Sequence, residues 1–129
     1  MFRVFISLSL ILFLLNSCIG YYPKEIFTPV GNELASCTKK DSIVDLFFDG
    51  EPITFEYEKV GLIEVQGANF DKDIDVINVL KKLANKKCCD AVIGIKKEYL
   101  QREAGLVFEN EHESTYKSIS YYGIGVKRK

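Results

Sequence analysis

The chain lacks an excess of charge of either sign. Its 129 residues carry 17 Lys and Arg against 18 Asp and Glu. Without the first 17 residues, which hold one basic and no acidic side chain, the net charge is about −2, with none of the basic excess on which nucleic-acid binding depends. Lysines scattered along a nearly neutral chain also give no reason to expect binding to anionic lipid headgroups. We therefore expect no nucleic-acid partner.

The chain also lacks the residue patterns of common catalytic and metal sites. It has no Ser-His-Asp order, phosphate-binding loop or helical metal motif. The single histidine, His112, lies among carboxylates in a polar stretch and is expected to be a solvated loop residue, although its charge can change near neutral pH. We expect a protein that is not an enzyme and carries no cofactor.

Nor is there an apolar run long enough for a lasting transmembrane helix. Arg3 precedes an uncharged apolar run from Val4 to Leu15, which is shorter than the roughly 18–20 residues that span a bilayer. A basic start, a short apolar stretch and small residues before a cleavage point are typical of a secretory signal. Residues 1–17 are therefore predicted to direct export.

The residues after this apolar run indicate lipidation. Leu15-Asn16-Ser17-Cys18 resembles the lipobox of bacterial lipoproteins, in which the cysteine sulfur receives diacylglycerol before cleavage. The alternative is an ordinary secretory signal in which Cys18 stands by chance. One lipid chain binds a membrane only marginally, so two or three on Cys18 would make a stable anchor. We expect a membrane-lipid anchor in the cell envelope, in the inner or outer membrane, with the domain outside the cytoplasm.

Three segments follow from these patterns: the signal at 1–17, a lipidated tether at 18–40, and a single small domain at 41–129. Residues 19–40 show no clean periodicity and include two prolines and a glycine, which is typical of a tether with at most one short ordered piece. The domain is in the size range where a single core is just sufficient.

Within the domain, alternation and turn residues predict one helix among strands. The helix is expected at 73–87, because Ile74, Ile77, Leu80, Leu83 and Ala84 form one apolar stripe. Aspartates crowd its start and lysines its end, which suits the helix dipole and needs no catalytic role. Strands are expected at 43–48, 58–66, 91–95 and 118–127, with 98–117 as a long loop or a hairpin around Gly105. This is an α+β fold in the order β-β-α-β-β, with one main helix packed on a small antiparallel-rich sheet.

The strand patterns also assign faces. In 58–66, Val60 and Leu62 are expected on one face, and Ile63 and Val65 on the other. In 118–127, one face holds Tyr122, Ile124 and Val126, and the other holds Tyr121, Gly123 and Gly125. Two glycines on one face of a strand indicate close approach by another element, and the helix is the expected one.

Three short motifs stand in order around the helix: Tyr57–Val65 (YEKVGLIEV), Cys89–Ile95 (CDAVIGI) and Tyr122–Val126 (YGIGV). Together they resemble the YbjQ-like family, whose core is similar to that of the RcsF-like envelope lipoproteins. The resemblance covers residues 43–127 loosely. Because the motifs consist of core residues, they imply architecture more than activity.

One departure from that family falls at the end of the helix. Where the family usually has Gly-Ala, this chain has Cys88-Cys89. A glycine at the first position would serve as the left-handed residue that ends the helix. We therefore expect Cys88 to have a positive φ, which is strained for a residue with a Cβ.

With Cys18 used for lipid, three cysteines remain: Cys37, Cys88 and Cys89. Export permits a disulfide, and the odd count leaves one thiol over. A bridge from Cys37 to Cys88 or Cys89, free half-buried thiols, and a metal site that includes His112 all stay open. A metal site is the least favoured, because adjacent cysteines lack the spacing of C-x₂-C pairs.

Two functions are compatible with these patterns. The first is a non-enzymatic envelope lipoprotein whose domain binds an envelope protein, senses a signal or assembles with itself into a homo-oligomer. The second is a small-ligand or metal-binding module that uses Cys88 and Cys89.

Overall fold

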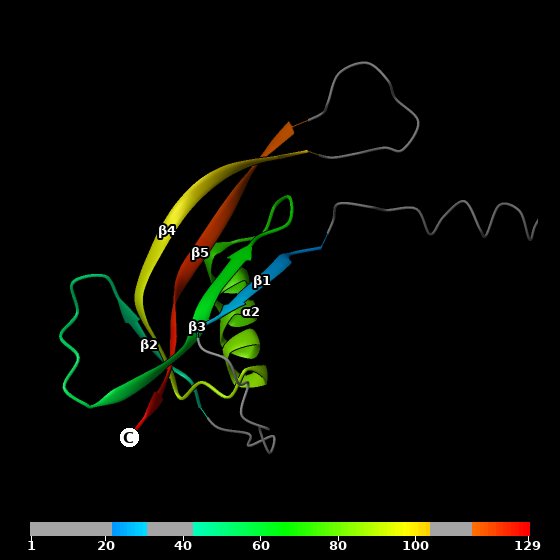
Figure 1. Cartoon of the computed structure of the whole chain (residues 1–129). Coiled ribbons are helices and arrows are strands. Elements are labelled where there is room, and N and C mark those ends of the chain that lie inside the picture. Colours follow the sequence, from blue (N-terminus) through cyan, green and yellow to red (C-terminus); the bar gives the residue numbers. More distant parts are fainter. Residues whose placement is uncertain (1–21, 31–42, 104–114) are drawn as a thin grey trace, which may run out of the picture.

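A computed structural model describes residues 22–30, 43–103 and 115–129 (Figure 1). Within these residues one helix lies among five strands. The elements, in chain order, are β1 (Lys24–Pro29), β2 (Asp45–Phe48), β3 (Tyr57–Gln66), α2 (Asp73–Lys86), β4 (Ala91–Glu103) and β5 (Thr115–Arg128). The α+β class is therefore confirmed. No helix in the described part of the chain is both long and apolar enough to cross a bilayer.

The strands form one mixed sheet in the order β1-β3-β5-β4-β2. Every neighbouring pair is antiparallel except β2 and β4, which are parallel. The expected order β-β-α-β-β is wrong, because helix α2 lies between β3 and β4 of five strands. The strand left out of that order is β1.

Strand β1 lies inside the stretch that was expected to be a tether. It pairs antiparallel with β3, from Lys24 opposite Gln66 to Pro29 opposite Gly61. None of its side chains is fully buried, so its sequence shows no strong apolar alternation. Its terminal proline is acceptable because β1 is an edge strand, where one side of the backbone needs no partner. The sheet therefore begins at Lys24.

Strands β4 and β5 form a long antiparallel pair. Their register runs from Ala91 opposite Val126 to Glu103 opposite Thr115. Strand β4 therefore extends well beyond the expected 91–95, whereas β5 differs from the expected 118–127 mainly in beginning at Thr115. Of the two expectations for 98–117, the hairpin is confirmed for the paired residues. The expected turn around Gly105 lies outside the described residues.

Helix α2 covers one face of the sheet, against β3, β5 and β1 (Figure 1). Its buried side chains are Val76, Leu80, Leu83 and Ala84. The expected stripe is wrong at its first residue, because Ile74 is 58% exposed and Val76 is buried instead. The cause is rotational: Asp73 lies three residues before Val76 and faces strand β5, which turns Ile74 toward solvent.

The face assignment in β5 is confirmed. Tyr121 belongs to the core under the helix, whereas Ile124 and Val126 pack on the opposite face. We call this opposite face the outer face. In β3, Leu62 is 51% exposed while Val60 packs on the core, so the expectation that they share a face is wrong. The register shift between Lys59 and Gly61 interrupts the alternation there.

The two glycines of β5 are closely approached, but not by the helix. A Cβ on Gly125 would lie 2.6 Å from Cys89 Sγ and 2.7 Å from Ile63 Cδ1, and one on Gly123 would lie 2.8 Å from Val92 Cγ1. The expected contact with the helix occurs elsewhere, at Gly67, where a Cβ would lie 2.8 Å from a methyl group of Val76.

A smaller apolar cluster lies on the outer face. It contains buried side chains of β4 and β5, with partly buried apolar residues around them: Ala91, Ile93 and Val126, packed against Phe47, Ile53, Phe55, Tyr57 and Ile124. Aromatic contacts join Phe55 to Phe47 and to Tyr57. The segment between β2 and β3 thereby covers one end of the outer face, and no other described element packs over the rest of it.

Candidate functional site: the cysteine pair, the outer face and the helix start

The cysteine pair begins where helix α2 ends. The Cys88 N–H donates to the Asn85 carbonyl and the Cys89 N–H to the Ala84 carbonyl, both at 3.0 Å. These two bonds are those of a Schellman motif, whose C′ residue adopts the left-handed conformation. Cys88 is that residue, with φ of 61°. The expected positive φ at Cys88 is therefore confirmed.

The two cysteines differ chemically. Cys88 is disulfide-bonded. Cys89 carries a free thiol that is 1% exposed, and burial raises its pKa to about 11. Cys18, Cys37 and His112 lie outside the described residues, and so does the other half of the disulfide.

This chemistry does not suit a metal site at Cys88 and Cys89. Zinc is bound by thiolates, whereas Cys88 is oxidised and Cys89 stays protonated over the physiological range. Within residues 22–30, 43–103 and 115–129, no three His, Cys, Asp or Glu side chains are grouped to hold a metal ion. Cys89 instead packs in the core, beside Gly125 and Ile63.

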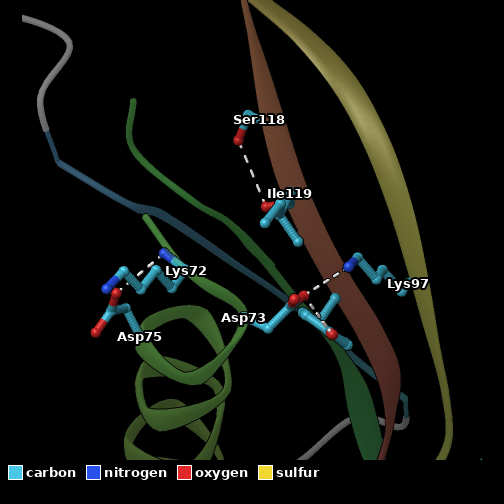
Figure 2. Close-up of polar contacts among 7 residues, drawn as sticks. Lys72, Asp73, Asp75, Lys97, Ser118 and Ile119 are labelled. Atoms are coloured by element: carbon cyan, nitrogen blue, oxygen red, sulfur yellow. Dashed lines mark hydrogen bonds and ion pairs between the residues drawn. The ribbon is translucent and has the colours of Figure 1, made fainter. Parts of the chain in front are cut away.

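A polar cluster ties the helix start to the sheet (Figure 2). The Lys97 ammonium lies 2.7 Å from Asp73 Oδ1, to which the Tyr121 hydroxyl also donates at 2.7 Å. The bond from Lys97, followed by that from Tyr121, lowers the pKa of Asp73, and the same carboxylate raises the pKa of Lys97. Burial and the bond to Asp73 raise the pKa of Tyr121.

Each group in this cluster is held in its ordinary charge state, so none is prepared to exchange a proton near neutral pH. The arrangement is that of a structural ion pair at the start of a helix, where a carboxylate also suits the helix dipole. Sequence reasoning identified Asp73 as a helix-start charge. It missed Lys97 and Tyr121, because strands distant in sequence bring them there.

The open part of the outer face contains a shallow pocket of about 150 Å³. It is lined by residues of β1, β3 and β5: Ile26, Thr28, Leu62, Ile63, Glu64, Tyr122 and Gly123. Pockets that enclose drug-sized ligands measure roughly 300–1,000 Å³. Glu64 is occupied there by hydrogen bonds from Gln66 at 2.7 Å and Ser120 at 3.4 Å. This pocket is too small and too open to enclose such a ligand.

At the end of β3, polar side chains of the neighbouring strands donate hydrogen bonds to backbone carbonyls. Arg102 Nη1 donates to the Gly67 carbonyl at 2.7 Å and to that of Gln66 at 3.3 Å, and the Ser118 hydroxyl donates to Gly67 at 2.5 Å. Ser118 is 1% exposed, so its hydroxyl needs this acceptor. These groups therefore hold the extended β4–β5 pair against the end of β3.

Comparison with models of known families, with curated proteins and with solved structures finds no match. The three motifs that resemble the YbjQ-like family lie in adjacent strands: Tyr57–Val65 in β3, Tyr122–Val126 in β5, and Cys89–Ile95 at the start of β4. They supply much of the core around the helix, so their likeness concerns packing. Membership of that family stays a hypothesis carried by these residues alone.

Proposed function

We propose that this chain is a bacterial envelope lipoprotein, anchored by lipid on Cys18, whose small α+β domain binds protein and catalyses no reaction. The observation that carries the proposal is the sequence Leu15-Asn16-Ser17-Cys18 directly after the apolar run that begins at Val4. A thiol at this position is the acceptor that lipidation requires.

Features of the domain support an interaction role. Its described polar clusters act within the fold: Asp73 holds the helix start, and Arg102 occupies strand-end carbonyls. The outer face carries a shallow pocket in place of an enclosed cavity, and Leu62 on it is 51% exposed. A sheet face that the described residues leave partly uncovered, with a shallow apolar pocket, suits contact with another protein surface better than capture of a small molecule.

The anchor is tested by metabolic labelling with a fatty-acid analogue in a bacterial host. We expect label on the parent chain and on the matched control Cys37→Ser. Cys18→Ser should carry no label and should accumulate as a larger, uncleaved precursor, because the thiol is required before cleavage. Normal cleavage of the parent chain without acyl label would exclude the lipoprotein proposal.

The interaction role is tested by affinity capture of the lipidated chain from its own envelope membranes, after mild cross-linking. We expect a defined protein partner, whether another envelope protein or a second copy of the chain. The comparison variant is Leu62→Lys, which places a charge on the outer face without changing the core. It should capture less of any partner that binds through this face. Capture of only the bait, as a monomer, would contradict an interaction role.

A further inference from the structure

We propose that two copies of this chain pair through the outer edge of β4 beyond Ile95, about a two-fold axis at Leu100. The two sheets then form one continuous sheet. The inference deepens the proposed interaction role by naming the partner as a second copy, and it does not depend on lipidation.

The edge in question is the side of β4 that faces away from β5 (Figure 1). Strand β2 pairs with this side only as far as Phe48 opposite Ile95, and the Asp49 N–H then donates to the Ile95 carbonyl at 3.0 Å. On its other side, β4 stays paired with β5 as far as Glu103. Within the described residues, the outer side of β4 from Lys97 onward therefore has no strand beside it.

Two hydrogen bonds show which backbone groups this edge presents. The Ile95 carbonyl points away from β5, because Asp49 donates to it. Independently, the Ile119 carbonyl accepts from the Gly67 N–H at 2.8 Å and so points away from β4. Tyr99 is the residue opposite Ile119, and its own N–H and C=O therefore point away from β5. Both observations assign the outward backbone groups to the odd-numbered residues.

This assignment restricts how a second copy can pair. In an antiparallel ladder, residues with outward groups lie opposite one another. Odd residues of one copy must therefore face odd residues of the other, and even residues must face even ones. A two-fold axis perpendicular to the sheet satisfies this condition when it passes through a residue, and fails when it passes between two residues. The candidate positions near the middle of the free edge are Tyr99, Leu100 and Gln101.

Charge selects among these registers. With Leu100 opposite itself, Glu98 of each copy faces Arg102 of the other, on the same face of the sheet. With Tyr99 opposite itself, Lys96 faces Arg102, and like charges directly opposite destabilise a sheet. With Gln101 opposite itself, Leu100 faces Arg102 and no opposite charges meet among residues 99–103. Of these three registers, only the one centred on Leu100 has both an apolar contact at the axis and two pairs of opposite charges, Glu98 with Arg102 on each side.

Glu98 and Leu100 are available for this contact, and Arg102 must change its side-chain conformation to make it. Glu98 is exposed and accepts one hydrogen bond, from the Tyr122 hydroxyl at 3.0 Å. Arg102 Nη1 donates to the Gly67, Gln66 and Tyr22 carbonyls, which lie across β5 from this edge. To face Glu98 of the second copy, Arg102 exchanges these bonds for a charge-assisted bond to the carboxylate, by a change of side-chain conformation. Leu100 is half-buried, and a second copy would cover the remainder.

The other edges of the sheet are less suited to pairing. Strand β1 ends in Pro29, which has no N–H to donate, and β2 has four residues with a register shift. Charged residues on an edge normally oppose indiscriminate pairing. On β4 the same charges match in one register, so they favour this dimer over other associations.

The experiment uses the full chain with Leu100→Cys, expressed in a bacterial envelope and run on a non-reducing gel. At the axis the two Leu100 positions face each other without hydrogen bonds, about 4.5 Å apart at Cα, which a disulfide can join. We expect a dimer band that reductant removes. In the matched control Glu98→Cys, the two thiols lie four residues apart along the strand, roughly 13 Å, and should not join.

Charge reversal tests the register. In the Leu100→Cys background, Glu98→Arg should reduce the dimer band several-fold, because it places Arg opposite Arg102 twice. Adding Arg102→Glu should restore the band. Folding is verified in each variant by protection of the buried Cys89 from alkylation. The proposal is overturned if a folded Leu100→Cys chain gives no dimer, if Glu98→Cys joins as readily, or if the adduct contains a different protein.

Failure of the pairing proposal can be distinguished from failure of the lipoprotein proposal. A chain that carries acyl label but forms no dimer overturns the two-fold pairing and leaves the lipoprotein proposal standing. A chain that forms the dimer without acyl label overturns the lipoprotein proposal and leaves the two-fold pairing standing.

Discussion

The Tyr121 hydroxyl donates a 2.7 Å hydrogen bond to Asp73 Oδ1, which joins strand β5 to the first turn of helix α2. Lys97 on β4 meets the same oxygen at 2.7 Å, so one carboxylate links three elements (Figure 2). This relationship explains why Asp73 faces the sheet while Ile74, its neighbour, is exposed.

Asp73→Asn should destabilise the domain at neutral pH and lose this effect in acid. The folded-state pKa of Asp73 is lowered from 3.8, chiefly by the bond from Lys97. A lowered folded-state pKa gives stability that is present above the unfolded value and lost as pH falls through the folded one. The difference in unfolding free energy from the parent should therefore shrink below about pH 4 in urea melts. The exposed Glu58→Gln serves as control, and a difference constant from pH 7 to pH 2 would contradict the assigned pairing.

Leu80→Ala should lower the free energy of unfolding by about 2–5 kcal/mol, as the loss of buried methyl groups does. Leu80 is fully buried in the core cluster beneath the helix. The matched control is Lys82→Ala on the exposed side of the same helix, which should stay within about 0.5 kcal/mol. Denaturant melts compare the two, and equal losses would mean that the helix packs by another face.

Cys88→Gly should change stability in opposite directions under reducing and oxidising conditions. In reductant the variant should gain about 1 kcal/mol, because glycine adopts the positive φ of this position without steric strain. In oxidant the parent keeps its disulfide, whose loss costs about 2–4 kcal/mol. Thermal melts in both buffers measure the two effects.

Cys88→Ser is the matched control for that experiment, because it removes the bridge and keeps the strain. It should therefore lose stability in oxidant and show no gain in reductant. A loss of equal size for Cys88→Gly in both buffers would indicate that Cys88 contributes mainly as a packed side chain. The same melts with Cys37→Ser would identify the second half-cystine, because only the true partner reproduces the oxidant-specific loss.

Cys89 should resist alkylation in the folded protein at pH 8 and react after denaturation. Burial excludes the reagent, and the raised pKa of about 11 leaves very little of the reactive thiolate. Because the folded-state pKa lies above the ordinary thiol value of 9.0, stability from this group is present below pH 9.0 and lost as pH rises toward 11. Mass spectrometry of iodoacetamide adducts, with and without urea, measures the protection. Rapid labelling of the native protein would disprove the burial of Cys89.

Gly125→Ala should destabilise the domain by about 1–3 kcal/mol, the usual effect of overpacking a core. The added methyl group would lie 2.6 Å from Cys89 Sγ and 2.7 Å from Ile63 Cδ1. Denaturant melts of the variant measure the change. Lys127→Ala, nearby on the same strand, is the control, and an unchanged midpoint for Gly125→Ala would show that β5 and Cys89 do not approach so closely.

Local features were the ones that sequence could predict. The helix was expected at 73–87 and is found at Asp73–Lys86, because its apolar period and terminal charges are encoded within a few turns. The positive φ of Cys88 was implied by the resemblance to a family that has glycine at this position. The faces of β5 followed from strict alternation, which a regular strand preserves.

Features that depend on partners in space were missed. Strand β1 has no buried side chain to mark it, and it is a strand only because the edge of β3 supplies its hydrogen bonds. Val60 departs from the alternation of β3 because the register shift falls at Val60 itself, between Lys59 and Gly61. The glycines of β5 indicated close approach correctly, but the approaching atoms belong to Cys89, Ile63 and β4, which a single strand cannot reveal.

The sequence by itself determined the class of fold and the extent of the helix, because helical periodicity and the charges at the helix ends act over a few residues. Tertiary structure alone decided that β2 runs parallel to β4, that Cys89 is buried, and that β4 extends past its neighbour and exposes an edge. Each of these results depends on which strands become neighbours. Strand pairing joins residues far apart in sequence through backbone groups that all residues share, and so it leaves little trace in side-chain patterns.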